Sequence, residues 1–371
     1  MVCESRINNQ VKIRRNNEVI IMAKKVGDLR EERSELVTVL RSQIAEQDIV
    51  LEAYKKSHGQ LEDFFEKVSL AIRPIIPLTN VFEKGSGKVD SPCLAVMRIS
   101  DGHMGAVQLP DEIEGFGEFN PELCRSRQID YAHRFCKWVD VNRGAYQIDE
   151  VAVIITGDLI SGDIHDELRV TNAFPTPVQC VRAAEVLVEQ VRLVASDFAK
   201  VVVHFLVEDN HARLTKKPQA KEAGYNSLNY VVGKLVEVYL SNLTNVEFNI
   251  YPQFEKIIHV LNRQYLISHG HGIKGWMGVP WYGIERHVGK EAKNRLQIIM
   301  DDITRAKDVG FHKYLFGHYH TYIETDLYSC CPSVSGTDAH DHKNGRHGLP
   351  GQSSWLIHPK YAEFNWINFK L

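Results

Sequence analysis

Short blocks of consecutive apolar residues recur along the chain from residue 94 onward, and amphipathic segments separate most of them. The apolar blocks predict strands at 94–100, 151–156, 201–207, 246–250, 256–260, 265–269, 312–318, 321–328 and 362–370. Apolar residues at helical spacing predict helices at 122–142, 177–199, 226–241 and 290–308. Continuous apolar strands bounded by helices are typical of an α/β fold with buried sheets.

Before residue 94, the apolar residues of the chain have a different spacing. Apolar residues from Leu29 to Val68 are spaced by sevens, fours and threes, which is typical of a helix with a narrow, coiled-coil-like seam. Pro74 and Pro77 end that helix. We therefore assign 1–28 to a basic mobile arm, 29–78 to the helical segment, 79–92 to a linker and 93–371 to the α/β domain. Self-association through 29–73 and packing on the α/β domain explain the seam equally well.

Composition narrows the class of protein. The 371 residues are 44% hydrophobic and 25% charged with a formal charge of −3, so a disordered chain or a generally basic polyanion-binding protein is excluded. The apolar runs fall short of the roughly 18 residues of a spanning helix, and no membrane partner is expected. Seven cysteines without a C-x-x-C pair, and no signal-peptide pattern, predict reduced thiols and a cytoplasmic location.

Metal-ligating residue types collect just after five of the predicted strands, where ligands bind in α/β folds. They are Asp101 and His103, then Asp158, then Asn210 and His211, then His269 and His271, and finally His318 and His320. Imidazole nitrogens with carboxylate and amide oxygens suit Mn, Fe, Zn or Ni. The set is too large for one tetrahedral ion, whereas two ions sharing a carboxylate would use it.

In series, the motifs D-x-H, G-D, N-H, H-G-H and G-H-x-H over residues 94–328 resemble those of the calcineurin-like metallophosphoesterase superfamily. The resemblance implies a four-layer α/β/β/α sandwich, with 93–371 as the catalytic domain. It implies one metal held by Asp101, His103 and His320, a second held by Asn210, His269 and His318, and Asp158 bridging both. It places His211 beside the substrate as a catalytic residue. Arg213, two residues on, is expected either to assist it or to be a solvent-facing loop residue.

Two positions near the third and fourth motifs are expected to face substrate. His269 precedes glycine as the ligand histidine of the family does, which leaves His271 to face the substrate. Asp209 replaces the glycine that usually precedes Asn-His, so we expect a positive φ there and an extra carboxylate beside the site. Such a carboxylate would tighten metal binding or repel an anionic substrate.

The predicted activity is dinuclear-metal-dependent hydrolysis of phosphoesters by a metal-bound hydroxide, with Mn²⁺ favoured and Fe, Zn, Ni or Mg as alternatives. The basic arm and the aromatic residues Trp276, Trp281 and Tyr282 favour a phosphodiesterase or nuclease acting on nucleic acid or a nucleotide. A phosphomonoesterase or protein phosphatase is the alternative within this class. A non-catalytic scaffold or assembly protein that uses the helical N-terminus is the alternative outside it.

Overall fold

The computed structural model describes residues 91–164, 166–274 and 278–371. The predictions for the basic arm (1–28), for the helical segment (29–78) with its self-association through 29–73, and for all but the last two residues of the linker (79–92) lie outside the described residues. Trp276 lies outside them as well. Among the described residues, no helix has the length and apolar character needed to span a membrane. The cytoplasmic location stays a prediction.

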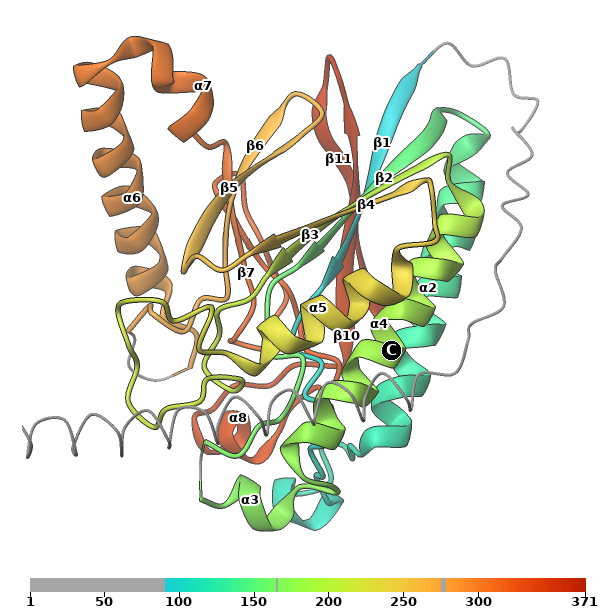
Figure 1. Cartoon of the computed structure of the whole chain (residues 1–371), viewed down its shortest axis with the longest axis vertical. Helices are drawn as coiled ribbons and strands as arrows, with labels where there is room; N and C mark the ends of the chain where they lie inside the picture. Colours follow the sequence, from blue (N-terminus) through green and yellow to red (C-terminus); the bar gives the residue numbers. More distant parts are fainter. Residues whose placement is uncertain (1–90, 165, 275–277) are drawn as a thin grey trace, which may run out of the picture. The chain divides into compact units, whose positions relative to one another are not determined.

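The α/β domain contains two sheets (Figure 1). The larger has six strands in the order β11-β10-β1-β2-β3-β4, and the smaller has five in the order β5-β6-β7-β9-β8. Strands of the larger sheet are β1 (Pro92–Ile99), β2 (Gln147–Ile155), β3 (Lys200–Leu206), β4 (Val246–Tyr251), β10 (Gly351–His358) and β11 (Ala362–Lys370). Those of the smaller sheet are β5 (Glu255–Val260), β6 (Arg263–Ser268), β7 (Lys313–Phe316), β8 (Ile323–Glu324) and β9 (Tyr328–Cys330).

Each of the two sheets contains a set of adjacent parallel strands. β1 to β4 form one parallel set, and β6, β7 and β9 form the other. The strands β10, β11, β5 and β8 pair antiparallel at the margins. Parallel strands bring their carboxyl ends to one edge of the sheet, so residues that follow them meet there.

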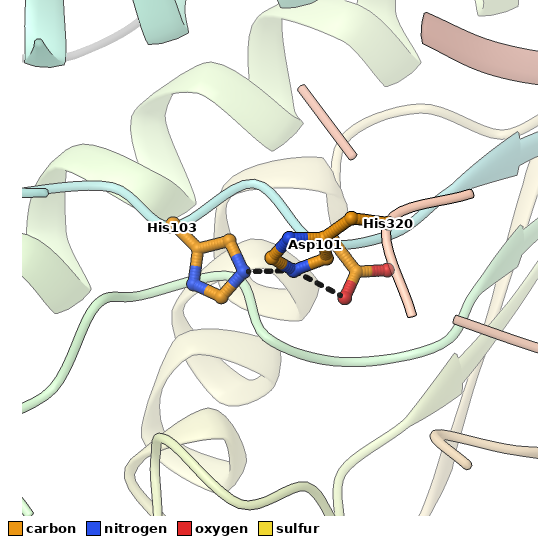
Figure 2. Close-up of side chains that lie close together, drawn as sticks. All are labelled: Asp101, His103 and His320. Atoms are coloured by element: carbon orange, nitrogen blue, oxygen red, sulfur yellow. Dashed lines mark hydrogen bonds and ion pairs between the residues drawn. The ribbon is translucent and has the colours of Figure 1, made fainter. Parts of the chain in front are cut away.

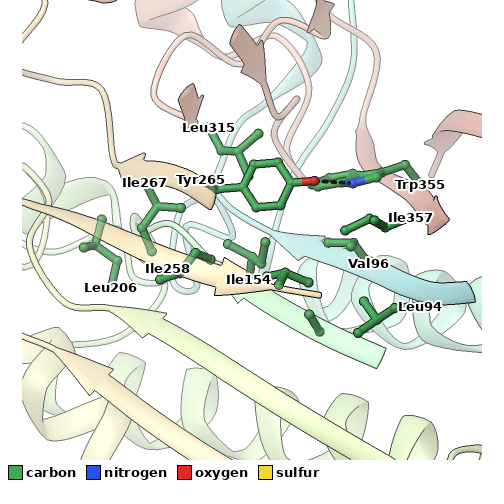
Figure 3. Packing of buried hydrophobic residues seen from close by; sticks show 12 residues of the cluster. Leu94, Val96, Ile154, Leu206, Ile258, Tyr265, Ile267, Leu315, Trp355 and Ile357 are labelled. Atoms are coloured by element: carbon green, nitrogen blue, oxygen red, sulfur yellow. Dashed lines mark hydrogen bonds between the residues drawn. The ribbon is translucent and has the colours of Figure 1, made fainter. Parts of the chain in front are cut away.

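The apolar faces of the two sheets pack on each other (Figure 3). The cluster between them draws on both sheets and consists of Leu94, Val96, Ala152, Ile154, Leu206, Ile258, Val260, Tyr265, Ile267, Leu315, Trp355 and Ile357. The indole N–H of Trp355 donates to the Tyr265 hydroxyl at 3.2 Å, so a polar group in this core is satisfied. Burying each large aliphatic side chain contributes about 1.5–3 kcal/mol, which makes this layer a main source of stability.

Helices cover the outer faces of both sheets (Figure 1). They are α2 (Pro121–Arg143), α4 (Thr176–Asp197) and α5 (Leu228–Leu240) on the larger sheet, and α6 (Trp281–Asp301) on the smaller one. Ile284 and Val288 of α6 pack into a second apolar cluster with Tyr314 and Phe316 of β7. The predicted α/β/β/α sandwich is therefore confirmed. The shorter elements are η1 (Pro110–Ile113), α3 (Leu168–Thr171), η2 (Ile303–Arg305), α7 (Ala306–Val309) and α8 (Ala339–Lys343).

Three elements differ from the sequence prediction. The single strand predicted at 321–328 is two short strands, β8 and β9, that pair antiparallel. The helix predicted at 290–308 begins at Trp281 and ends at Asp301, because Asp302 has an extended backbone and caps a new turn through Thr304. Strand β10 was not predicted, since its first half is polar; its Gln352 is buried and hydrogen-bonds the backbone of Ser100.

Because of His204, a buried histidine on β3, we expect the folded protein to lose stability in acid. His204 accepts or donates a hydrogen bond with the Tyr251 hydroxyl at 3.0 Å, and burial lowers its pKa from 6.5 to about 4. The unfolded chain therefore binds a proton first, so stability is full above pH 6.5 and falls between pH 6.5 and 4, by about 3 kcal/mol in all. We expect His204→Leu to flatten this fall in urea unfolding of metal-free protein. An identical pH profile in the variant would contradict the prediction.

Candidate metal centre

The ligand residues predicted from the sequence follow the carboxyl ends of five strands. Asp101 and His103 follow β1, Asp158 follows β2, Asn210 follows β3, His269 follows β6, and His318 and His320 follow β7. Because β1 to β3 are parallel, as are β6 and β7, these residues lie at one edge of each sheet. Groups of three donors within 4.8 Å of one another join residues from both sheets. The fold thus brings together segments separated by more than 200 residues.

The backbone of this edge is held in an unusual conformation. Five of the predicted ligand residues have positive φ, namely Asp101 (52°), His103 (45°), Asp158 (49°), His318 (70°) and His320 (54°). Each such non-glycine residue costs of order 1–3 kcal/mol and persists only where the surroundings enforce it. Strain of this kind clusters at functional sites. Asp209 does not have a positive φ, contrary to the expectation for the position of the family glycine.

Hydrogen bonds between the strand ends enforce these conformations. The Asp101 N–H donates to the Gly157 carbonyl at 3.0 Å, and the His103 N–H donates to the Asp158 carbonyl at 2.9 Å. The Asp101 carboxylate accepts the backbone N–H of His318 at 2.9 Å, which ties the end of β1 to the end of β7. The two sheets are therefore connected at the site itself.

The first donor cluster consists of Asp101, His103 and His320 (Figure 2). The Nε2 atoms of His103 and His320 lie 3.0 Å apart, and the His320 Nε2 lies 3.5 Å from the Asp101 Oδ1. All three side chains are buried, with exposed fractions of 0%, 5% and 7% for Asp101, His103 and His320. Three donor atoms that converge out of contact with bulk water are suited to hold a cation.

The second donor cluster consists of Asp158, His269 and His318. The His269 Nε2 lies 2.9 Å from the Asp158 Oδ2. The same Asp158 oxygen lies 4.0 Å from the His103 Nε2, so this carboxylate stands between the two clusters. Asn210 is the remaining predicted ligand, and its Oδ1 is buried with no hydrogen-bond partner among the described residues. A buried amide oxygen without a partner costs about 1–3 kcal/mol, a cost that a bound cation would remove.

Two of the imidazoles are held neutral. Burial, aided by the charge of His211, lowers the pKa of His103 to about 3. Burial, with the charge of His269, places the pKa of His318 well below its usual value. A neutral imidazole offers a nitrogen lone pair to a metal ion at neutral pH.

The other two imidazoles instead hold a second ring proton and carry a positive charge. Burial alone would lower the pKa of His269, but the adjacent Asp158 carboxylate outweighs it and raises the pKa to about 10. Burial is likewise outweighed at His320, where the carboxylates of Asp341 and Asp101 place the pKa well above its usual value. A cation that binds these nitrogens must displace protons, so its affinity decreases as the pH falls.

His211 lies beside both clusters, and a hydrogen bond from its Nδ1 fixes the orientation of its ring. Its Nδ1 lies 2.6 Å from the Ser161 carbonyl oxygen; because a carbonyl only accepts, Nδ1 carries the proton. Its Nε2 then faces the Asp158 Oδ2 at 3.9 Å. Gly162 permits this approach, since it has a φ of 66° and a Cβ there would strike the His211 carbonyl. The ring is 19% exposed, so it reaches both the site and solvent.

The remaining predicted site residues occupy different surroundings. The His271 Nε2 lies 3.5 Å from the Glu208 Oε2, and its ring centroid lies 5.6 Å from that of His269, so it flanks the second cluster. Arg213 donates to the carbonyls of Thr215 and Lys216 and so braces its own loop.

The side chain of Asp209 points into the protein interior. It is 1% exposed, and its carboxylate accepts from the Asp158 N–H at 2.6 Å, from the Ala212 N–H at 2.8 Å and from the Asn229 amide. Burial, with the charge of Asp158, raises its pKa to about 6. Asp209 therefore shapes the loops that carry Asp158 and Asn210.

Sequence reasoning missed several residues around the site. Glu208 and Asp341 are buried carboxylates against His271 and His320, and Arg346 is a buried guanidinium against Asp341. For Asp341 and Arg346, the one indication in the sequence was that residues 336–351 are rich in His and Asp. It gave no indication of which side chain reaches the site.

Comparisons with known proteins give only weak structural likenesses. No family model matches the sequence, and no curated protein matches it. Solved structures similar to this chain include a predicted phosphoesterase from Streptococcus pneumoniae, with 10% identity over 75% of this chain and 97% of that chain and a TM-score of 0.24. Vacuolar Protein Sorting 29 from Cryptosporidium parvum has 10% identity over 75% of this chain and 99% of that chain, with a TM-score of 0.27. Likenesses this weak carry no argument about activity.

Proposed function

We propose that this chain is a dinuclear-metal-dependent phosphoesterase that hydrolyses phosphodiesters of nucleic acid or a nucleotide. The observation that carries the proposal is the pair of buried donor clusters at one edge of both sheets, with Asp158 between them. A buried set of carboxylates and imidazoles of this size is costly to maintain unless it binds cations. The strained backbone at five of its members supports the same conclusion.

Each cluster would hold one divalent cation. Asp101, His103 and His320 would hold the first, Asn210, His269 and His318 the second, and Asp158 would contact both. Two such cations supply charge neutralisation at the phosphate oxygens and lower the pKa of water. Mn²⁺ is the ion we favour, because the donor set combines imidazoles, which suit transition metals, with carboxylate and amide oxygens.

His211 would donate a proton to the leaving oxygen. The Ser161 carbonyl holds its Nδ1–H, so the ring presents Nε2 to the clusters. In its protonated form, Nε2 carries the second proton and can transfer it to an oxygen that departs from phosphorus. Partial exposure of the ring allows it to regain that proton from solvent.

Charge beside the clusters supports a diester substrate. Glu208 and Asp209 add two buried carboxylates to those that would bind metal. A phosphodiester carries one negative charge, whereas a monoester carries close to two at neutral pH, and the additional carboxylates repel the second charge.

Trp281 and Tyr282, 52% and 78% exposed at the start of α6, are aromatic surfaces on which a base can stack.

A substrate panel tests the proposal. Bis(p-nitrophenyl) phosphate, p-nitrophenyl phosphate, a cyclic nucleotide, and single- and double-stranded DNA are each assayed with Mn²⁺, with chelated protein as the background. We expect hydrolysis of the diester to exceed that of the monoester by at least about tenfold, the effect of one partly screened unit of charge repulsion.

The panel also separates the alternatives. Faster hydrolysis of the monoester would contradict the diester proposal and favour a phosphomonoesterase or protein phosphatase. A protein that binds Mn²⁺ yet hydrolyses none of the substrates would contradict the enzymatic proposal and favour a scaffold or assembly role.

A further inference from the structure

The far side of the His320 ring meets a carboxylate that the proposed function does not use. The His320 Nε2 faces the first cluster, 3.0 Å from the His103 Nε2, whereas its Nδ1 lies 2.5 Å from the Asp341 Oδ2. Asp341 belongs to α8 and is 1% exposed. The two nitrogens of one ring therefore serve two different partners, a cation site on one side and a buried carboxylate on the other.

Asp341 is itself held in place. Its Oδ1 lies 2.9 Å from the Nε of Arg346, which is 8% exposed. Its backbone N–H donates to Asp338 at 2.7 Å, and its carbonyl accepts the N–H of Arg346 at 2.9 Å. The Arg346 guanidinium lies 5.7 Å from the centre of the Tyr319 ring. The segment from Asp338 to Arg346 thus packs against the G-H-Y-H motif as a support.

We infer that Asp341, fixed by Arg346, is a positioning residue for His320: it holds the proton on Nδ1 and leaves Nε2 to bind the cation of the first cluster. The inference rests on the proposed function. A carboxylate on the second nitrogen of a ligating histidine fixes the tautomer and the ring orientation and raises the basicity of the ligating nitrogen. Asp341 would therefore strengthen metal binding without touching the metal.

The arrangement differs from that of the neighbouring histidines. His269 and His211 place Nδ1 against the backbone carbonyls of Thr156 and Ser161, at 2.8 and 2.6 Å. A carbonyl fixes the tautomer, but it adds no formal charge to the ligand. Loss of the Asp341 charge should therefore weaken the first cluster and spare the second, which no general loss of folding would do.

A separate metal site built from His320, Asp338 and Asp341 is the competing interpretation, since their donor atoms lie within 4.8 Å of one another. Arg346 argues against it. A cation at Asp341 would lie beside a buried guanidinium, and like charges repel strongly in such surroundings. A third cation would also compete for Nδ1 of His320, which the Asp341 carboxylate already engages.

The test compares Mn²⁺ binding to the metal-free full chain and to Asp341→Asn, by calorimetry and by electron paramagnetic resonance. We expect one of two binding steps to weaken by about 10- to 100-fold and the other to stay within about threefold. The metal-free variant should melt at a lower temperature, because the buried Arg346 loses its charged partner, so the two proteins are compared at a temperature at which circular dichroism shows both to be folded. Glu363→Gln is the matched control: its carboxylate pairs with Arg263 at 2.9 Å and accepts from Tyr265 at 3.0 Å. It should leave both Mn²⁺ steps unchanged.

Several outcomes would overturn the inference. Unchanged Mn²⁺ binding by Asp341→Asn would do so, as would a third Mn²⁺ in the wild type that the variant loses. If Asp341→Asn does not fold, Arg346→Gln replaces it, and unaltered affinity at both steps in that variant overturns the inference as well. A wild type that binds two Mn²⁺ but hydrolyses no phosphoester contradicts the proposed function alone, because the binding test of Asp341 still gives its result.

Discussion

Asp158→Asn should lower diester turnover on the order of 10⁴-fold, the scale seen when one member of a catalytic set is removed. The reason is its position: one carboxylate oxygen lies 2.9 Å from the His269 Nε2 and 4.0 Å from the His103 Nε2, so both donor clusters depend on it. An amide carries no charge to hold two cations together. Bound Mn²⁺ should fall below about one ion per chain.

The fold should survive this substitution. The Asp158 backbone N–H and carbonyl make the local hydrogen bonds to Asp209 and His103, and an asparagine oxygen can still accept from the His211 N–H. Asp163→Asn, an exposed carboxylate on the same loop, is the matched control and should keep full metal content and rate. Near-normal turnover of Asp158→Asn would show that the two clusters do not form one dinuclear centre.

His211→Ala should separate turnover from metal binding. If His211 protonates the leaving oxygen, the variant retains both ions and loses about 10²-fold or more in rate on a dinucleotide, whose leaving alcohol is poor. The loss should shrink to less than about tenfold on bis(p-nitrophenyl) phosphate, because nitrophenolate leaves without protonation. Metal analysis and rates on the two substrates, measured on the same preparation, check this expectation.

The control for His211 is another histidine outside the site. His259→Ala removes an exposed imidazole of β5 and should change neither metal content nor either rate. Equal losses on both substrates in His211→Ala would point to a structural role for the Ser161 contact. Loss of one ion would make His211 a ligand.

Much of the fold could be predicted because its strands are fully buried. Apolar runs such as 151–156 and 201–207 correspond closely to β2 (Gln147–Ile155) and β3 (Lys200–Leu206), since buried parallel strands are apolar on both faces. Strand β10 was missed because its polar residues, Gln352 to Ser354, are buried and satisfied by partners distant in sequence. Burial of a polar side chain depends on those partners, and a local pattern does not contain them.

The convergence of these side chains was predictable for a related reason. Metal-ligating residues that directly follow buried parallel strands must meet at one sheet edge, so their order along the chain already indicated a shared site. The supporting groups follow no such rule. Asp341 contacts His320 from 21 positions further along the chain, beyond the strands β8 and β9. The side chain of Asp209 points into the interior only because Asn229, Ala212 and Asp158 offer donors there.

The amino-acid sequence by itself therefore determines most of the strands, the longer helices and the donor types, since periodicity and strand-end position are local properties of the chain. The packing of the two sheets sets which donors share an oxygen of Asp158, which ring nitrogen of His320 faces the cluster and which carboxylate lies behind it. These are distances of a few ångströms between segments as far apart as Asp101 and His320. They arise only when the apolar faces of both sheets pack together, because that packing brings the two sets of strand ends to a common edge.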